Sequence, residues 1–229
     1  MELKLNLPHP IVVFDTETGG LNPECEISWN LEIAATGKVG DSLHGQIKRL
    51  AAPILEIGAI LVSPKDLSEV SYFHTFCGPE KDESFDSFLN RCTPMALQVN
   101  GFKDRLDVIK SAPPMSEALR AFKSFFPKNG TKLAKFLPCG QNIRFDIDML
   151  NAACRKSGID LEIKTPPLEL ITYSQLYFAL PDTEVVANYK LTTVAQALGI
   201  STKDAHTALA DVRMTLACLK KMFARFSSF

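Results

Sequence analysis

The fold is decided by the stretch Ile11-Val12-Val13-Phe14-Asp15-Thr16-Glu17-Thr18-Gly19-Gly20-Leu21 near the start of the chain. Its first four residues are β-branched or aromatic, which is typical of a strand buried on both faces of a sheet. A polar turn from Thr18 to Pro23 ends this predicted strand. Asp15 and Glu17 are two positions apart, so a backbone that stays extended would present both carboxylates on one face. An isolated Asp-x-Glu pair is also common at a solvated strand end, and the pair alone therefore decides nothing.

Further strands follow along the chain. Residues 53–62 and 70–76 are predicted strands, and the short turn Ser63-Pro64-Lys65-Asp66 between them favours an antiparallel hairpin. A shorter strand is predicted at residues 135–139. Residues 24–52, between the first two strands, are mixed in composition and are expected to be an insertion.

The insertion starts just after the turn that follows Asp15 and Glu17, so we expect it near the mouth of any site built on them. In that position Trp29 would stack on a base and the pair Lys48-Arg49 would hold phosphate. A packed loop anchored by Trp29 is an equally good interpretation.

Four helices are predicted from apolar residues at helical spacing. One follows Pro114, and one follows Gly140 and carries Asp146. A third covers residues 191–198 and stops at glycine, and the last starts near Asp204, which is a good N-cap residue. Strands that come early, with helices between and after the later ones, predict an α/β fold with a mixed sheet flanked by helices.

Composition limits the class of protein. A chain of 229 residues with 46% hydrophobic and 22% charged content is expected to form one soluble domain over residues 1–229. No early segment joins basic residues to a long apolar stretch, so we expect no membrane span and an intracellular, by default cytoplasmic, location. The six cysteines form no CxxC pair, which favours reduced thiols. A net charge of −1 argues against a general nucleic-acid coat, although a protein that grips only a strand end needs few basic residues.

Two further carboxylates lie on predicted helices. Asp146 shares the core-facing stripe with Met149, so its charge needs a salt bridge, a metal ion or a role as cap of its own helix. Asp211 lies beside the apolar stripe of the last helix, in a row with the small residues Ala208 and Thr215. Small neighbours allow another element to approach closely.

His206 is predicted in the first turn of the last helix, where the helix N-terminus favours a neutral imidazole. A histidine at a helix start is more often a surface or packing residue. Four carboxylates suit Mg²⁺ or Mn²⁺ better than zinc. Two such ions about 3.5–4 Å apart can activate water for phosphodiester hydrolysis, and a neutral histidine can accept the proton of that water.

Three motifs together resemble those of the DEDDh exonucleases, the DnaQ-like group within the ribonuclease H-like fold. The motifs are Val13 to Leu21, Gln141-Asn142-Ile143-Arg144-Phe145-Asp146, and Ala205-His206-Thr207-Ala208-Leu209-Ala210-Asp211. Ile54 to Ala59 and Phe73 to Phe76 are similar to the family's second and third strands. The resemblance runs in family order from Pro10 to about Phe223.

The resemblance implies a role for particular side chains. It implies that two Mg²⁺ or Mn²⁺ ions are bound by Asp15, Glu17, Asp146 and Asp211, with His206 as general base. It also implies that the terminal nucleotide is contacted by Thr16, Thr18 and Leu21, with Asn142 supporting the site. Three positions depart from the family pattern: Gly19 replaces a common threonine, and Gln141 and Asn100 replace common histidines. All three lie outside the catalytic set.

The expected function is therefore a metal-dependent 3′→5′ exonuclease that releases nucleoside monophosphates from single-stranded or frayed 3′ ends, with DNA favoured and proofreading or DNA repair as its setting. An RNA-trimming or oligoribonucleotide-degrading enzyme is the alternative, and recognition of the 2′-hydroxyl would separate the two. A non-catalytic nucleic-acid or polymerase-binding module is a third interpretation, against which the filled catalytic positions argue. The family implies a polymerase or a second copy of the chain as partner.

Overall fold

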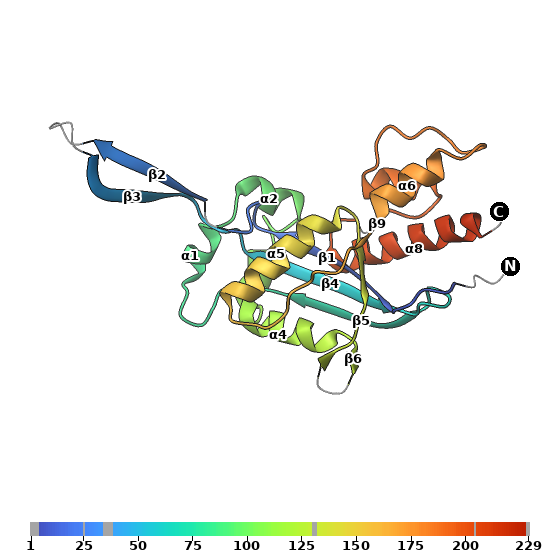
Figure 1. Cartoon of the computed structure of the whole chain (residues 1–229), viewed down its shortest axis with the longest axis horizontal. Helices are drawn as coiled ribbons and strands as arrows, with labels where there is room; N and C mark the ends of the chain where they lie inside the picture. The colour runs from blue at the N-terminus through green and yellow to red at the C-terminus, as the bar shows by residue number, and fades with distance from the viewer. Residues whose placement is uncertain (1–4, 25, 34–38, 130–131, 204, 228–229) are drawn as a thin grey trace.

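The computed structural model describes residues 5–24, 26–33, 39–129, 132–203 and 205–227, with the backbone alone for 26–33, 39–49, 129 and 132–133. In these residues a five-stranded sheet has the order β5-β4-β1-β8-β9 and is flanked by helices (Figure 1). The strands of this sheet are β1 (Ile11–Thr18), β4 (Ile54–Val62), β5 (Glu69–Phe76), β8 (Leu137–Gly140) and β9 (Leu168–Glu169). The predicted mixed sheet is confirmed.

The helices that carry or cover the site come from every part of the chain. The described helices are α1 (Phe85–Leu89), α2 (Pro94–Val99), α3 (Leu106–Ser111), α4 (Met115–Phe125), α5 (Ile143–Lys156), α6 (Leu170–Phe178), α7 (Leu191–Ala197) and α8 (Ala208–Phe226). The helices predicted after Pro114 and Gly140 and at residues 191–198 are confirmed. Among the residues described, no helix is both long and apolar enough to cross a membrane.

The strand β1 lies in the middle of the sheet. It pairs antiparallel with β4 and parallel with β8. Its side chains alternate between two cores: Val12 and Phe14 pack with residues of α4 and α5, whereas Ile11 and Val13 pack with residues of α6, α7 and α8. This alternation follows from the period of two in a strand, and it confirms a strand buried on both faces.

The predicted hairpin of the second and third strands is also confirmed. Strands β4 and β5 pair antiparallel with Ile60 opposite Tyr72, and β5 forms an edge of the sheet. A second hairpin, formed by β2 (Glu26–Ile33) and β3 (Val39–Arg49), occupies the stretch considered as an insertion and projects from the body of the molecule (Figure 1). The side chains of Trp29, Lys48 and Arg49 lie outside the described residues. A third, short hairpin joins β6 (Lys128–Asn129) to β7 (Lys132–Leu133).

The start of the last helix differs from the prediction. The helix α8 begins at Ala208 with Thr207 at its N-cap position, and Asp204 lies outside the described residues. His206 has a φ of 74°, which is the left-handed region that a right-handed helix excludes. The prediction that His206 lies in the first helical turn is therefore wrong, because the chain turns at His206 before the helix starts.

Gly58 in β4 allows the N-terminal turn of α8 to lie directly on the sheet. A Cβ at this position would meet the backbone carbon of Ala208 and the backbone nitrogen of Leu209 at 2.5 Å. The small neighbours noted beside Asp211 in the sequence therefore accompany a close approach, as predicted. The approach fixes the distance between α8 and the sheet.

Gly58→Ala is expected to destabilise the protein by about 1–3 kcal/mol, because the added methyl group must displace the backbone of α8. The displaced helix would carry Asp211 with it, so the activity should also fall. Urea denaturation measures the first effect. An unchanged denaturation midpoint would show that α8 is not fixed by this contact.

Candidate active site

Three acidic side chains converge at one end of β1. The strand stays extended through Thr18, so Asp15 and Glu17 lie on the same face, as predicted. This face packs against α8, whose first turn carries Asp211. One carboxylate oxygen from each of the three residues lies within 4.8 Å of the other two. The structure therefore brings together residues separated by almost two hundred positions in the chain.

Asp146, the fourth predicted ligand, lies beside this group. It is 3% exposed, and its Oδ1 accepts hydrogen bonds from the backbone N–H of Thr16 at 2.8 Å and from the Thr16 hydroxyl at 2.7 Å. Its negative charge raises the pKa of Asp15. Asp146 thus approaches the group from the α5 side of the sheet.

The alternative role of Asp146 as cap of its own helix is wrong. The N-cap position of α5 is Asn142, which has a φ of 53°. The first N–H groups of this helix are bound by Glu169 of β9, whose carboxylate oxygens accept from Asn142 N at 2.8 Å and Ile143 N at 3.0 Å. Asp146 is therefore free of capping and is held by Thr16 instead.

The acidic group is desolvated and crowded with negative charge. Burial raises the pKa of Glu17 to about 8, with further contributions from the charges of Asp211 and Glu56. Burial also raises the pKa of Asp15 well above its usual range, and the neighbouring carboxylates add to this shift. The pKa of Asp146 is raised by burial to about 7, although the hydrogen bonds from Thr16 oppose the shift. Carboxylates that are crowded and desolvated in this way are poorly stable as anions until a cation joins them.

The donor set fits a divalent metal ion. The ion pairs seen among the described residues involve other carboxylates than Asp15, Glu17 and Asp211. Hard carboxylate oxygens are the ligands that Mg²⁺ and Mn²⁺ prefer. Asp15, Glu17 and Asp211 could therefore hold a divalent ion, with Asp146 close by.

His206 lies at the exposed edge of the acidic group. Its backbone N–H donates to Oδ1 of Asp211 at 3.3 Å. Burial raises the pKa of Asp211, and this hydrogen bond opposes part of that shift. The left-handed backbone at His206 and the extended Thr207 turn the chain into α8. The histidine is thus placed beside the predicted ligands by a turn and not by a helix.

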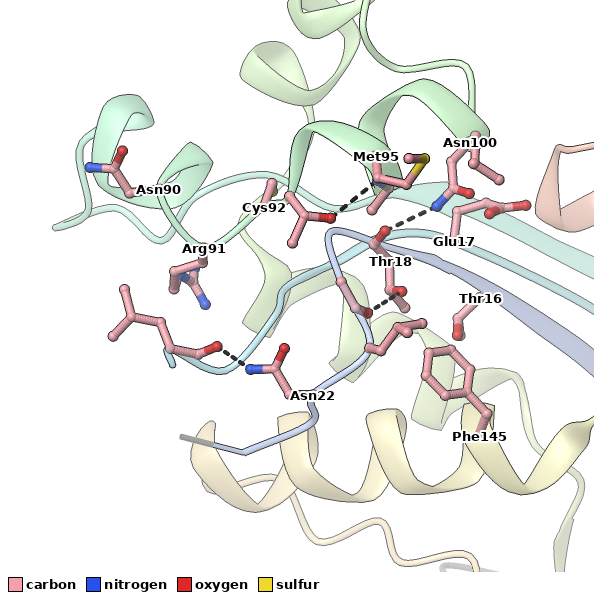
Figure 2. A pocket seen from close by; sticks show the side chains of 16 residues that line it. Thr16, Glu17, Thr18, Asn22, Asn90, Arg91, Cys92, Met95, Asn100 and Phe145 are labelled. Carbon is pink, nitrogen blue, oxygen red and sulfur yellow. Dashed lines mark hydrogen bonds between the residues drawn. The ribbon is translucent and has the colours of Figure 1, made fainter. Parts of the chain in front are cut away.

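A cavity of about 860 Å³ opens next to the acidic group. It runs between α5 and α2, and its lining includes Glu17, Leu21, Phe145, Met95 and Asn100 (Figure 2). Leu21 is 83% exposed, so its side chain offers an apolar surface to anything that enters. The volume and the largely apolar lining are typical of a site for a small organic group such as a nucleotide base.

The four residues predicted to contact or support the substrate do not all lie in the cavity. Thr16, Thr18 and Leu21 line the cavity. The hydroxyls of Thr16 and Thr18 donate to Asp146 and to the carbonyl oxygen of Gly20, so only their oxygen lone pairs remain for a ligand. Asn142 is exposed at the start of α5, four positions before Asp146. All four contacts stay predictions.

Two departures from the family motifs have a structural explanation. A Cβ at Gly19 would lie 2.6 Å from Sγ of Cys92 and 2.9 Å from Cδ of Pro53, so threonine does not fit this backbone. Asn100 donates from Nδ2 to the carbonyl oxygen of Thr18 at 3.0 Å and thereby holds the turn that follows β1 (Figure 2). The third, Gln141, donates from Nε2 to the carbonyl oxygen of Tyr189 at 2.7 Å.

Sequence reasoning missed Glu56. This residue lies in β4 directly opposite Glu17 in β1 and is 1% exposed. A single acidic residue within the apolar run from Ile54 to Val62 was the available signal. The cavity residues of α2 were missed as well, because no local pattern shows that α2 packs beside β1.

Comparison with known proteins gives the same family as the motifs. The family model described as RNase T, exonuclease, matches residues 12–219. The chain belongs to this exonuclease family. The DNA polymerase III PolC-type protein of Caldanaerobacter subterraneus subsp. tengcongensis is 25% identical over 224 residues, which are 98% of this chain and 12% of that protein.

Solved structures of Escherichia coli exonuclease I share the fold of this exonuclease domain. A zinc-bound complex with single-stranded DNA has a TM-score of 0.66 at 16% identity, covering 96% of this chain and 43% of that chain. A complex described as ExoI/SSB-Ct has a TM-score of 0.64 at 16% identity, covering 97% and 44%. The exonuclease domain thus spans less than half the length of these proteins, and the ribonuclease H-like fold expected from the motifs is confirmed.

The stability of the exonuclease domain in EDTA is expected to fall as the pH rises from about 4.5 to about 8. The pKa of Glu17 is raised from 4.5 to about 8 and that of Asp146 from 3.8 to about 7, so the folded state retains protons that the unfolded state has released. Folding is therefore favoured at the acidic end of this window, and the advantage is lost as the folded carboxyls ionise.

Urea denaturation at a series of pH values measures this slope. Glu17→Gln removes one of the carboxyls whose pKa is raised by burial, so its unfolding free energy should depend less on pH than that of the wild type. Equal slopes for the two proteins would contradict the assignment of the raised pKa to Glu17.

Proposed function

We propose that this domain is a metal-dependent 3′→5′ exonuclease that removes nucleoside monophosphates from single-stranded or frayed 3′ ends of DNA. The observation that carries the proposal is the group of Asp15, Glu17 and Asp211 at the edge of a cavity large enough for one nucleotide. The solved relatives described as complexes with single-stranded DNA and with a dT13 oligonucleotide support DNA as the substrate.

The chemistry divides between the bound ions and the protein. Two Mg²⁺ or Mn²⁺ ions, held by Asp15, Glu17 and Asp211 with Asp146 nearby, would supply Lewis acidity for attack on the phosphodiester. His206 would accept the proton of the attacking water, because its backbone is bonded to Asp211 and its side chain is exposed to solvent. Leu21 and Phe145, which line the cavity, would pack against the terminal base.

Matched DNA and RNA oligonucleotides labelled at the 5′ end test the proposal. Products that shorten one nucleotide at a time with Mn²⁺ or Mg²⁺ and disappear in EDTA are expected, with DNA degraded faster than RNA. Faster degradation of RNA would favour the exoribonuclease alternative. Binding without degradation in either metal would leave a non-catalytic module.

The polymerase context of the PolC-type relative supports a proofreading role, in which this domain would act on the primer end beside a polymerase. A mismatched primer terminus is expected to be shortened faster than a matched one, because a frayed end enters a single-strand site without the cost of unpairing. Equal rates on both termini would argue against this role.

Asp146→Asn is expected to abolish activity while leaving the stability in EDTA equal to or greater than that of the wild type. The amide Oδ1 can still accept both hydrogen bonds from Thr16, whereas the desolvated charge is removed at nearly constant volume. The variant should also gain less from added Mn²⁺, because ligand binding stabilises only the state that binds.

Thermal melts in EDTA and in millimolar Mn²⁺ measure both effects. Asp146→Ala serves as the contrast, since it leaves the buried Thr16 N–H without an acceptor and should lose about 1–3 kcal/mol. If Asp146→Asn were as unstable in EDTA as Asp146→Ala, the charge itself would be structural and the metal-site assignment of Asp146 would be wrong.

A further inference from the structure

Glu56 is a buried acid that the proposed chemistry does not use. It lies in β4 opposite Glu17 and is 1% exposed. Gly58 of the same strand face contacts α8, so Glu56 and the acidic group share the side of the sheet covered by that helix. The charge of Glu56 raises the pKa of both Glu17 and Asp211. The residue is therefore close enough to act electrostatically on the acidic group.

His74 holds Glu56 in place. Its Nε2 lies 2.7 Å from Oε1 of Glu56, and its ring packs edge-on against Phe76 at a centroid distance of 5.0 Å. The side chain of His74 is 31% exposed and that of Glu56 is 2% exposed, so the pair links a solvent-facing ring to a buried carboxylate. A buried carboxylate in an apolar strand is costly unless such a donor accompanies it.

The pair of Glu56 and His74 lines a second cavity and is therefore not sealed within the core. Glu56 and His74 line a cavity of about 590 Å³ together with Thr207, which is the N-cap residue of α8 and follows His206. The pair thus lies between the acidic group and an open surface. A bond that served only to join β4 to β5 would not require this position, because the two strands are already joined by their backbone pairing.

We propose that Glu56, held by His74, is a positioning residue of the metal site. It adds a negative charge beside Glu17 and Asp211 and thereby strengthens the binding of a divalent cation by those two ligands. The inference rests on the proposed function, because it requires that Glu17 and Asp211 bind metal. Partners that are hydrogen-bonded to metal ligands change metal affinity about 10–100-fold when they are lost, and a charge that acts through space is expected at the lower end of that range.

Calorimetric titration with Mn²⁺ tests the role of Glu56. Glu56→Gln keeps the shape and the contact with His74 but removes the charge, and we expect its Mn²⁺ affinity to fall about tenfold. At saturating Mn²⁺ its turnover should return to near the wild-type value, whereas the Mn²⁺ concentration for half-maximal rate should rise. Glu69→Gln, an exposed change at the start of β5, should bind Mn²⁺ as the wild type does.

Asp15→Asn separates failure of this inference from failure of the proposed function. If Asp15→Asn binds Mn²⁺ normally, the metal site itself is misplaced and both proposals fall. If Asp15→Asn binds weakly and Glu56→Gln binds like the wild type, only the role of Glu56 is overturned.

A double-mutant comparison tests the role of His74. His74→Ala should weaken Mn²⁺ binding in the wild type and add little in the Glu56→Gln background, because the two side chains act as one unit. His74→Gln retains a donor and should recover part of the affinity. Lower melting temperature in His74→Ala with unchanged Mn²⁺ affinity would show a purely structural pair and overturn the proposal.

Discussion

Asp15→Asn is expected to lower the rate of nucleotide release by at least about 10³-fold while leaving the fold intact. Asp15 belongs to the group of three carboxylates, and the charge of Asp146 also raises its pKa, so Asp15 lies close to all the other predicted ligands. Stabilisation of transition-state charge by a bound metal is worth several kcal/mol, and each 1.4 kcal/mol changes a rate about tenfold. Asparagine keeps the volume of the side chain but loses the anion that binds the metal.

Single-turnover assays on a 5′-labelled oligonucleotide measure this loss, with circular dichroism to verify folding. Glu17→Gln and Asp211→Asn should give losses of the same order. Asp148→Asn is the matched control, because Asp148 lies on the same helix as Asp146 but pairs with Arg144 at the surface. Near wild-type turnover in any one of the ligand variants would show that its residue is misassigned.

His206→Ala is expected to lower turnover by about 10²-fold, the usual effect of losing a general base, without loss of Mn²⁺ binding. The contact between His206 and Asp211 is made by the backbone N–H, so the alanine variant can keep it. The predicted effect is therefore on the rate and not on the assembly of the acidic group.

The backbone of His206 requires a second variant. At a φ of 74° alanine is strained, whereas glycine adopts this conformation freely. His206→Gly should therefore be as slow as His206→Ala but closer to the wild type in stability. His9→Ala, in the segment before β1, controls for the loss of any histidine. Full activity in both His206 variants would remove the residue from the mechanism.

The central strands and long helices could be predicted because their patterns are local. The apolar run before Asp15 and the helical spacing after Pro114 each report burial directly. The start of α8 could not be predicted in this way. The turn at His206 involves the carboxylate of Asp211, which accepts the His206 N–H. The short strand β9 was also missed, because two residues carry no period and its pairing with β8 is a tertiary contact.

The acidic site was predicted by the combination of spacing and family motifs. The structure places Asp15, Glu17 and Asp211 together, but it also shows what spacing cannot. Glu56 reaches the group only through the register of β1 against β4, and a register is set by the whole hairpin. The cavity depends on α2, which is held beside the turn by the bond from Thr93 N to the carbonyl oxygen of Gly19. Both are tertiary effects without a local signature.

The base of the projecting β2–β3 hairpin is closed by bonds between its two ends. Gly19 N donates to the carbonyl oxygen of Pro53 at 2.8 Å, and Ala52 N donates to that of Asn22 at 2.9 Å. The side chain of Asn22 also donates to the carbonyl oxygen of Leu50. For the rest of the domain, the hairpin is therefore a loop whose two ends are held together by hydrogen bonds. The entropy of closing such a loop changes only slowly with its length. Variation in the length and sequence of the arm is thereby uncoupled from the geometry of the acidic group, which leaves the arm open to evolutionary change while the chemistry stays fixed.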